Sequence, residues 1–381
     1  MKYIYLDYAA ATPVDPRVLK AMMPYFSEFF HNPSSVYLAA RQARKTLEQA
    51  RQTVAKCLGA KAGEIIFNCG ATEANNLAIS GVMRQFPQAE VLLSSIEHES
   101  VLAPAGQFKH RLIPVDKSGI VDLKQLARMI NNKTVLISVM YINNEVGTIQ
   151  PLAKIAQVVK AIKRQRLKNK IDRPLYLHTD AAQAGNLFDL RVARLGVNLM
   201  SLNGGKIYGP KQSGALYVKA GAKLRPLILG GGQEFGLRSG TESLAAAVGL
   251  AEALKAAQTN KDAELKRLQE LSTRFIEELN QKLPDAKVNG HPKARSPHII
   301  SLSLPGQDGE RLVMELDERG IQAAVGSACS AARQDPSHVL RALGLPEPLI
   351  RSSLRFSFGR ATTVDDLVTT AKTLATVIAR S

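Results

Sequence analysis

The sequence of 381 residues contains no tryptophan, few other aromatic residues and only three cysteines, Cys57, Cys69 and Cys329. These cysteines lie far apart, and none belongs to a CxxC or CxxH pair. Such spacing indicates neither a disulfide framework nor a zinc site, and we predict no bound metal. It leaves room for a single reactive thiol.

Long apolar runs are also missing, since none approaches the ~20 residues needed to span a bilayer. The first residues, Met-Lys-Tyr-Ile-Tyr-Leu-Asp, enter a strand-like run at once and show no signal-peptide pattern. We therefore expect a cytoplasmic protein with no membrane partner.

Acidic residues are scarce beside basic ones, because 33 Asp and Glu against 50 Lys and Arg leave a net charge of +17. The densest basic run lies within residues 160–173, where only Asp172 interrupts Lys160, Lys163, Arg164, Arg166, Lys168, Lys170 and Arg173. A solvated surface is the simpler interpretation, and a surface for nucleic acid or for an acidic protein is the other. The run holds no aromatic residue that would stack on bases, so the nucleic-acid signal is weak.

The order of apolar segments predicts an α/β fold with two domains. Short strand-like runs alternate with helical segments, as in a mostly parallel sheet, at residues 64–68, 91–95, 134–141, 175–179, 199–202 and 214–218. Beyond Ser243, a long helical run precedes a strand near residues 298–304 and two further helices, which is typical of an α+β unit. We predict a large domain of residues 15–253 and a smaller α+β domain of residues 1–14 and 254–381, which carries a loop around Cys329.

Two segments have the composition of phosphate-binding turns. Gly70-Ala71-Thr72 joins a strand to a helix, whose N-terminal N–H groups and dipole attract phosphate, and Thr72 adds a hydroxyl. An ordinary Thr-capped helix explains the same residues. A second Gly-rich segment, Gly230-Gly231-Gly232, precedes Arg238-Ser239-Gly240-Thr241.

Polar residues follow several predicted strands, at the strand ends where α/β sheets bind ligands. His98 ends one strand-like run and is either a stacking or proton-moving group or an ordinary satisfied polar residue. Asn143 and Asn144 end another strand-like run, and they either contact a cofactor or form a turn. An apolar strand runs into Asp180, three residues before Gln183, and predicts a buried carboxylate of the kind that pairs with the pyridinium nitrogen of pyridoxal phosphate.

Three further residues carry candidate chemistry. Lys206 follows Asn203-Gly204-Gly205, where glycines allow close approach and a desolvated amine would form a Schiff base; a surface lysine is the alternative. Cys329 lies in a loop of small residues that leaves a thiolate accessible. Arg355, in a strand-like run, suits a bidentate contact with a carboxylate.

These motifs, in this order, resemble the cysteine desulfurases of the NifS/IscS type, in the class V branch of fold-type I pyridoxal-phosphate enzymes. The resemblance runs nearly end to end through Tyr5-Leu-Asp-Tyr, Gly70-Ala-Thr-Glu, Glu97-His98, Asn143-Asn-Glu, Asp180 with Gln183, Lys206-Ile-Tyr-Gly-Pro, Arg238-Ser-Gly-Thr, Gly326-Ser-Ala-Cys and Arg355-Phe-Ser.

The resemblance implies the fold-type I architecture and a set of cofactor contacts. Lys206 would bind the cofactor covalently, Asp180 would pair with its ring nitrogen, Gln183 would contact its ring oxygen, and His98 would stack on the ring. The phosphate would lie against Ala71, Thr72 and Asn203, with Thr241 reaching in from the other subunit of a homodimer.

The resemblance also implies the reaction. Asn144, which also contacts the cofactor, and Arg355 would hold L-cysteine, and the Lys206 amine would take its Cα proton. The Cys329 thiolate would then take the sulfur, leaving a persulfide and L-alanine. The persulfide would pass to an acceptor protein in iron–sulfur cluster assembly or to a tRNA-modifying enzyme.

Some positions depart from the family pattern. Asn203-Gly204-Gly205-Lys206 stands where the family usually has Ser-x-His-Lys, and a missing imidazole costs about 1–3 kcal/mol of cofactor affinity. We expect weaker cofactor retention or compensation by a nearby cation or amide. Cys69 replaces a hydroxyl residue, Phe235 replaces an arginine, and a C-terminal tail used for scaffold docking is not expected.

Other functions remain open. A selenocysteine lyase would share the residues, whereas another class V enzyme such as an aminotransferase would not need Cys329. A homologue that has lost the cofactor is a further alternative, because of Gly205. A nucleic-acid binder is supported by net charge alone, without a motif.

Overall fold

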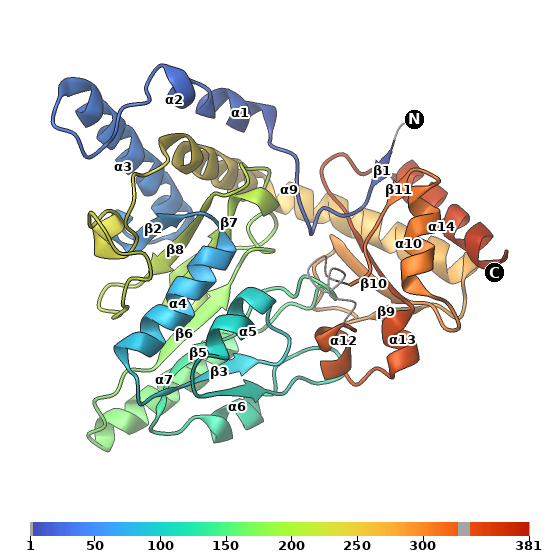
Figure 1. Ribbon diagram of the computed structural model, residues 1–381. Coiled ribbons are helices and arrows are strands. Elements are labelled where there is room, and N and C mark those ends of the chain that lie inside the picture. The colour runs from blue at the N-terminus through green and yellow to red at the C-terminus, as the bar shows by residue number, and fades with distance from the viewer. Residues whose placement is uncertain (1–2, 327–335, 381) are drawn as a thin grey trace.

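The computed structural model describes residues 3–326 and 336–380, so the predicted sulfur acceptor Cys329 lies outside the described residues. Figure 1 shows a large domain around a twisted sheet and a smaller domain joined to it by the long helix α9 (Leu244–Lys282). The predicted α/β class, with a large mostly parallel sheet, is confirmed.

The main sheet has seven strands in the order β2-β8-β7-β6-β5-β3-β4. Only β8 runs antiparallel to its neighbours, so the other six strands point the same way and end at one edge. The strands are β2 (Ile65–Asn68), β3 (Glu90–Ser94), β4 (His110–Ile113), β5 (Thr134–Ser138), β6 (Tyr176–Asp180), β7 (Leu199–Asn203) and β8 (Gly214–Val218).

Both faces of this sheet are covered by helices because its strands are apolar on both sides. In β3, Leu92 belongs to one core cluster while Val91 and Leu93 belong to another. The first cluster includes side chains of α3 (Leu38–Leu58), α7 (Leu152–Lys168) and the first part of α9, and the second includes those of α4 (Ala71–Gln85) and α5 (Glu99–Ala105). Strands buried on both faces are typical of doubly wound parallel sheets.

Helix α3 illustrates how the sequence pattern sets local structure. Its buried side chains recur at three- and four-residue steps, at Ala43, Leu47, Val54 and Leu58 among others, as the periodicity predicts. The helix ends at Gly59, whose φ of 61° is the left-handed conformation that glycine adopts readily.

The smaller domain holds an antiparallel sheet in the order β12-β10-β9 and a short parallel pair, β1 with β11. The helices α10, α14 and the second half of α9 pack on it. The elements are β1 (Ile4–Tyr5), β9 (Lys287–Asn289), β10 (Ile299–Ser303), α10 (Gly309–Asp317), β11 (Ile321–Gln322), α12 (His338–Ala342), α13 (Glu347–Arg351), β12 (Ser353–Ser357) and α14 (Val364–Ile378).

Helix α9 runs without interruption across the predicted boundary between residues 253 and 254, which stays a prediction. Its buried residues up to Leu254 pack in the large-domain core, whereas those from Leu268 onward pack in the small-domain core. Within residues 3–326 and 336–380, no helix combines the length and the apolar character that a membrane-spanning segment needs.

Candidate functional site

A cavity of about 240 Å³ opens at the edge where the parallel strands of the main sheet end. Nine of the predicted site residues line it, from strands and loops far apart in the chain: Ala71, Thr72, His98, Asn144, Asp180, Gln183, Asn203, Lys206 and Arg355. Five of the sheet's strands therefore contribute residues at or just beyond their carboxyl ends, as expected for a ligand site of an α/β sheet.

Lys206 ends a 3-10 helix, η2 (Gly204–Lys206), that directly follows β7. The Asn203 side chain starts this turn, because its Oδ1 accepts a hydrogen bond from the Gly205 amide at 3.0 Å. The Lys206 Nζ donates to the carbonyl oxygens of Ala9, at 2.7 Å, and of Ala10. The candidate nucleophilic amine is thus held inside the cavity by the N-terminal segment, so the surface-lysine alternative is not supported.

Asp180, the last residue of β6, is a buried carboxylate, as its position after an apolar strand predicts. It accepts hydrogen bonds from the Asn75 Nδ2 at 2.7 Å and from the Ala182 amide at 2.9 Å. Both donors fix the position of the carboxylate at the end of β6.

His98 is connected to that carboxylate through two polar side chains. The Asn75 Nδ2 also donates to Ser100 Oγ at 2.8 Å, and this hydroxyl lies 2.8 Å from the His98 Nδ1. Because the Ser100 amide donates to the same Nδ1, that nitrogen is an acceptor, which assigns the ring proton to Nε2. His98 therefore lines the cavity with the orientation of its ring fixed by these contacts.

The turn between β2 and α4 has the geometry of an anion site. Gly70, with a φ of 118°, leads directly into the first turn of α4, where Ala71 and Thr72 face the cavity. A Cβ on Gly214, in the adjacent strand β8, would lie 2.4 Å from the Gly70 Cα, so only glycine allows this approach. The free N–H groups of the helix and the Thr72 hydroxyl suit a phosphate.

Arg355, in β12, brings the small domain into the cavity. Its guanidinium is buried and donates to Asp7 Oδ1 at 2.7 Å and to the Asn144 carbonyl at 3.1 Å, while its Nε has no hydrogen-bond partner among the described residues. A buried donor without an acceptor is costly, and a ligand carboxylate would satisfy it. The sequence left two roles open for Asn143 and Asn144, contact with a cofactor and formation of a turn. Asn143 forms the turn through its Oδ1, whereas Asn144 lines the cavity.

Gln183 is oriented by His298, a histidine that the sequence motifs did not identify. Its Nε2 donates to the Ala9 carbonyl at 3.0 Å, and its Oε1 lies 3.4 Å from the His298 Nε2. Burial lowers the pKa of His298 to about 4, so the ring is neutral at pH 7.

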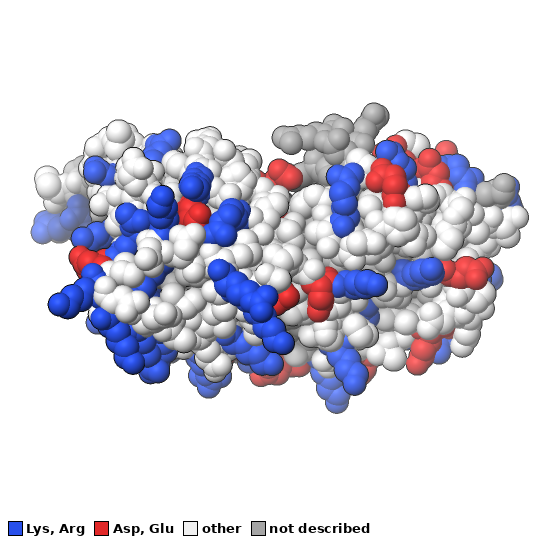
Figure 2. All heavy atoms as spheres, turned by 90° about the horizontal axis from the view of Figure 1, so that it is seen from below, with Lys and Arg blue, Asp and Glu red and all other residues white. Residues whose placement is uncertain are grey.

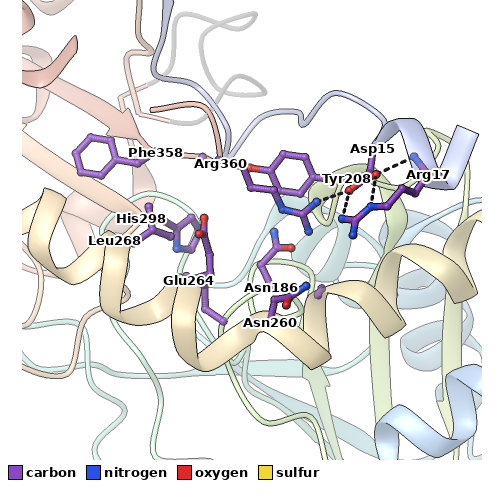
Figure 3. A pocket seen from close by; sticks show the side chains of 13 residues that line it. Asp15, Arg17, Asn186, Tyr208, Asn260, Glu264, Leu268, His298, Phe358 and Arg360 are labelled. Atoms are coloured by element: carbon purple, nitrogen blue, oxygen red, sulfur yellow. Dashed lines mark hydrogen bonds and ion pairs between the residues drawn. The ribbon is translucent and has the colours of Figure 1, made fainter. Parts of the chain in front are cut away.

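A second cavity, of about 280 Å³, is lined by His298 and by Asn186. The Nδ2 of Asn186 donates to the Lys206 carbonyl. Figure 3 shows the polar end of this cavity, where Asp15 contacts Arg17 and Arg360. None of the predicted site residues within 3–326 and 336–380 lines it, so we place the chemistry in the smaller cavity.

Glu97 is a fully buried carboxyl group beside the site. One oxygen accepts the Met140 amide at 2.7 Å, and the other has no hydrogen-bond partner in the part of the chain that the structure describes. Burial raises the pKa of Glu97 to about 8, with a smaller contribution from Asp180. The group is therefore mainly protonated at pH 7.

Thr241 does not line the cavity that contains Lys206. It is exposed and lines a third cavity together with Cys69 and Arg238, which form an N–H···S contact of 3.2 Å. Phe235, another departure from the family pattern, lies with its ring 5.0 Å from the Arg51 guanidinium, which also pairs with Glu234.

The sequence motifs missed the inner surface supplied by residues near the N-terminus. The Ala9 and Ala10 carbonyls carry no side-chain signal, so residue types alone would not reveal them. Asn75 did have a signal, because it stands in the Thr-x-x-Asn pattern, but its pairing with Asp180 depends on the sheet. Asp7 belongs to the Tyr5-Leu-Asp-Tyr motif, which assigns it no role of its own.

Comparison with known proteins places the chain in a family. The Aminotransferase class-V family model matches residues 4–369. The cysteine desulfurase IscS of Dictyoglomus turgidum is 40% identical over 98% of this chain and 94% of its own. Among solved structures, a NifS-like protein is 30% identical, covers all of both chains and has a TM-score of 0.91. SspA, solved in complex with cysteine, is 34% identical over 93% of this chain and 98% of its own, with a TM-score of 0.80.

The matches span nearly the whole chain and include the residues that form the cavity. The chain belongs to the class-V aminotransferase family and, within it, to the cysteine desulfurases.

Proposed function

We propose that the protein binds pyridoxal 5'-phosphate and L-cysteine in the cavity around Lys206 and transfers the cysteine sulfur to Cys329, releasing L-alanine. The observation that carries the proposal is the convergence of Lys206, Asp180 and Arg355 in one cavity of a chain that belongs to the cysteine desulfurases.

The residues of the cavity fit the cofactor. Asp180 is the buried carboxylate that a pyridinium nitrogen requires, and the first turn of α4 with Thr72 suits the phosphate. Gln183 and His98 would contact the ring oxygen and the ring face, and Lys206 would bind the cofactor covalently. When bound, pyridoxal phosphate stabilises negative charge at the substrate Cα.

The side chains would then divide the work on cysteine. The unpartnered Arg355 Nε points to a contact with the substrate carboxylate, beside Asn144. The Lys206 amine, which lies on the Ala9 and Ala10 carbonyls, would accept the Cα proton.

Sulfur transfer requires a second thiolate. The Cys329 thiolate would attack the substrate sulfur, forming an S–S bond as the substrate C–S bond breaks. The carbon fragment gains protons and leaves as L-alanine, while Cys329 keeps the persulfide for an acceptor protein.

We also propose that the active form is a homodimer. Large apolar side chains crowd the surface of α1 (Pro16–Met22), α2 (Pro24–Ser27) and the segment up to α3, and a second group lies at residues 228–235, on the side away from the small domain (Figure 1). Such patches on a protein surface mark interfaces. A second copy on this side would bring its Thr241 toward the phosphate end of the cavity.

The decisive experiment measures both products. The purified protein with pyridoxal phosphate, L-cysteine and a thiol reductant should release alanine and sulfide in equal amounts. The Cys329→Ser variant should lose both products, whereas Cys57→Ala, in the half-buried α3 position, should keep them. Cofactor binding without alanine release by the wild type would overturn the assignment, and L-selenocysteine in a parallel reaction measures preference between the two substrates.

The dimer is tested separately by light scattering during gel filtration. Phe30→Asp, in the apolar surface, should shift the protein toward monomer, whereas Met314→Asp, an equally exposed apolar residue in α10 of the small domain, should not. A wild-type monomer at working concentration would contradict the proposal.

A further inference from the structure

One surface of the large domain is strongly basic. It is formed by α7, by the loops before β5 and β6, and by the end of β8, and it consists of Lys133, Lys160, Lys163, Arg164, Lys168, Lys170, Arg173 and Lys219, which we call the basic face. Figure 2, a view from below onto the α6 (Leu123–Met129) and α7 side of Figure 1, shows Lys and Arg over much of the large domain and few acidic side chains there.

The charges of the basic face are not neutralised by the protein. Among the ion pairs of the described residues, none involves a side chain of this face, and Asp172 is the one acidic residue within residues 160–173. In α9, by contrast, Arg267 pairs with Glu264 and Lys282 pairs with Glu278. On an ordinary solvated helix, basic side chains pair with acidic ones, as they do on α9. Solvation alone therefore does not explain the cations of the basic face.

The members of the face lie close enough to repel one another. Burial lowers the pKa of Lys163, and the neighbouring charges of Lys219 and Arg166 lower it further. Retaining like charges side by side is unfavourable unless an anion offsets them.

A buried arginine holds this surface rigid. The Arg166 guanidinium donates to the carbonyls of Asn131 and Thr134 before and in β5, and to those of Arg173 and Pro174 before β6. It thereby fixes the end of α7 to both loops that carry the exposed cations. A rigid array loses little entropy when a ligand binds.

The face lies at the opposite edge of the sheet from the cavity. Lys133 directly precedes the amino end of β5, and Arg173 precedes β6, whereas Asp180 and Lys206 lie at or beyond the carboxyl ends of their strands. A ligand on the basic face therefore leaves the entrance of the cavity free.

We propose that the basic face binds the phosphate backbone of a double-helical nucleic acid. Phosphate contacts need only Lys and Arg, which this face supplies, whereas a protein partner usually needs apolar or aromatic anchors. On α7, Leu167 is the one large apolar side chain with high exposure. Single strands bind by stacking on aromatic rings, which the basic face lacks, so a duplex is the better partner.

The test measures binding of the pyridoxal-phosphate-loaded protein to labelled duplex RNA and duplex DNA, in separate arms, between 50 and 200 mM salt, a range in which phosphate contacts weaken by orders of magnitude. Binding should weaken linearly on a log–log plot. The variant Lys133→Gln, Lys160→Gln, Arg164→Gln, Lys168→Gln should bind at least about tenfold more weakly, and its salt slope should fall by about 3 to 4 units.

A matched control changes the net charge equally on the small domain: Lys266→Gln, Lys287→Gln, Lys293→Gln, Lys372→Gln, all exposed and outside the ion pairs described. It should bind duplex like the wild type, and both variants should release alanine normally. If both variants lost duplex binding equally, binding would depend on net charge rather than on the basic face, and the proposal would be overturned. Tighter binding of polyglutamate than of either duplex would also overturn it, in favour of an acidic protein.

Discussion

The Asn75 side-chain amide lies 2.7 Å from the Asp180 carboxylate and donates a hydrogen bond to it from the first helix after β2. The same Nδ2 also reaches Ser100, which contacts His98. Asn75 therefore connects the carboxylate proposed for the ring nitrogen with the histidine proposed for the ring face. Its own Oδ1 has no partner, so the amide orientation is set by these two acceptors.

Replacing this amide should weaken cofactor binding. Without the Asn75 donor, the Asp180 carboxylate loses a hydrogen bond worth roughly 1.5–3 kcal/mol and is no longer held in place. We expect Asn75→Ala to bind pyridoxal phosphate about tenfold or more weakly, measured by fluorescence titration, and to release alanine more slowly at subsaturating cofactor.

Asn76→Ala is the control, because Asn76 is half-buried and donates to the Thr72 carbonyl within its own helix. This variant should match the wild type in both assays. If Asn75→Ala kept the wild-type affinity and rate of alanine release, the amide would have no role in holding Asp180.

The Gly205 position tests the departure from the family pattern. A Cβ at Gly205 would have its nearest contacts at 3.5 to 3.7 Å, on Asn203 and Lys211, which is ordinary packing. A side chain therefore fits there, beside a residue that lines the cavity. We expect Gly205→His to retain pyridoxal phosphate longer during dialysis, by a factor of about 3 or more, through the restored contact.

Gly205→Ala separates the imidazole from the mere presence of a side chain and should release the cofactor at the wild-type rate. Gly204 offers no such room, because a Cβ there would lie 2.0 Å from the Ser213 Oγ. Equal retention by the histidine and alanine variants would show that another group already compensates.

Much of the fold could be predicted from residue pattern, for a physical reason. The strands β5 and β8 are buried on both faces and are apolar along most of their length, so short apolar runs between helical segments identified them. The run ending at Tyr141 was predicted too long, because β5 ends at Ser138, although the Val139 and Tyr141 amides still donate to the β6 carbonyls of His178 and Asp180.

The site was less predictable where backbone groups, rather than side chains, make the contacts. Side-chain types at strand ends identified Asp180 and Lys206, but the Ala9 carbonyl is shared by Lys206 and Gln183 and belongs to the N-terminal segment. His298 is likewise assigned only by packing, since it approaches Gln183 from the turn before β10, 115 residues away. Such contacts arise from tertiary structure, which local periodicity does not encode.

Arg355 should act on substrate rather than on cofactor. Arg355→Lys keeps the charge near Asp7 but removes the planar Nε–H that lacks a partner. We expect the KM for L-cysteine to rise about tenfold or more, with little change in the affinity for pyridoxal phosphate, measured by alanine release and fluorescence titration.

The control for this variant is Arg351→Lys, since Arg351 is exposed on α13 and pairs with Glu347. It should leave KM unchanged. A fall in kcat at constant KM in Arg355→Lys would contradict a role in binding the carboxylate.

Glu97 makes the stability of the fold depend on pH. Its pKa is raised by burial from 4.5 to about 8, so between these values the folded chain keeps a proton that the unfolded chain loses. The folded state then binds more protons, and the free energy of unfolding falls as the pH rises through this window, by about 1.4 kcal/mol per pH unit at most. Above about pH 8 the contribution becomes constant.

Glu97→Gln removes this titration while keeping the acceptor for the Met140 amide. We therefore expect the stability of Glu97→Gln, relative to the wild type, to increase steadily from pH 5 to pH 8, measured by urea unfolding at fixed pyridoxal phosphate concentration. Glu99→Gln, in the exposed first turn of α5, should show no such trend. A stability difference that stays constant across this range would mean that Glu97 is already ionised in the folded protein.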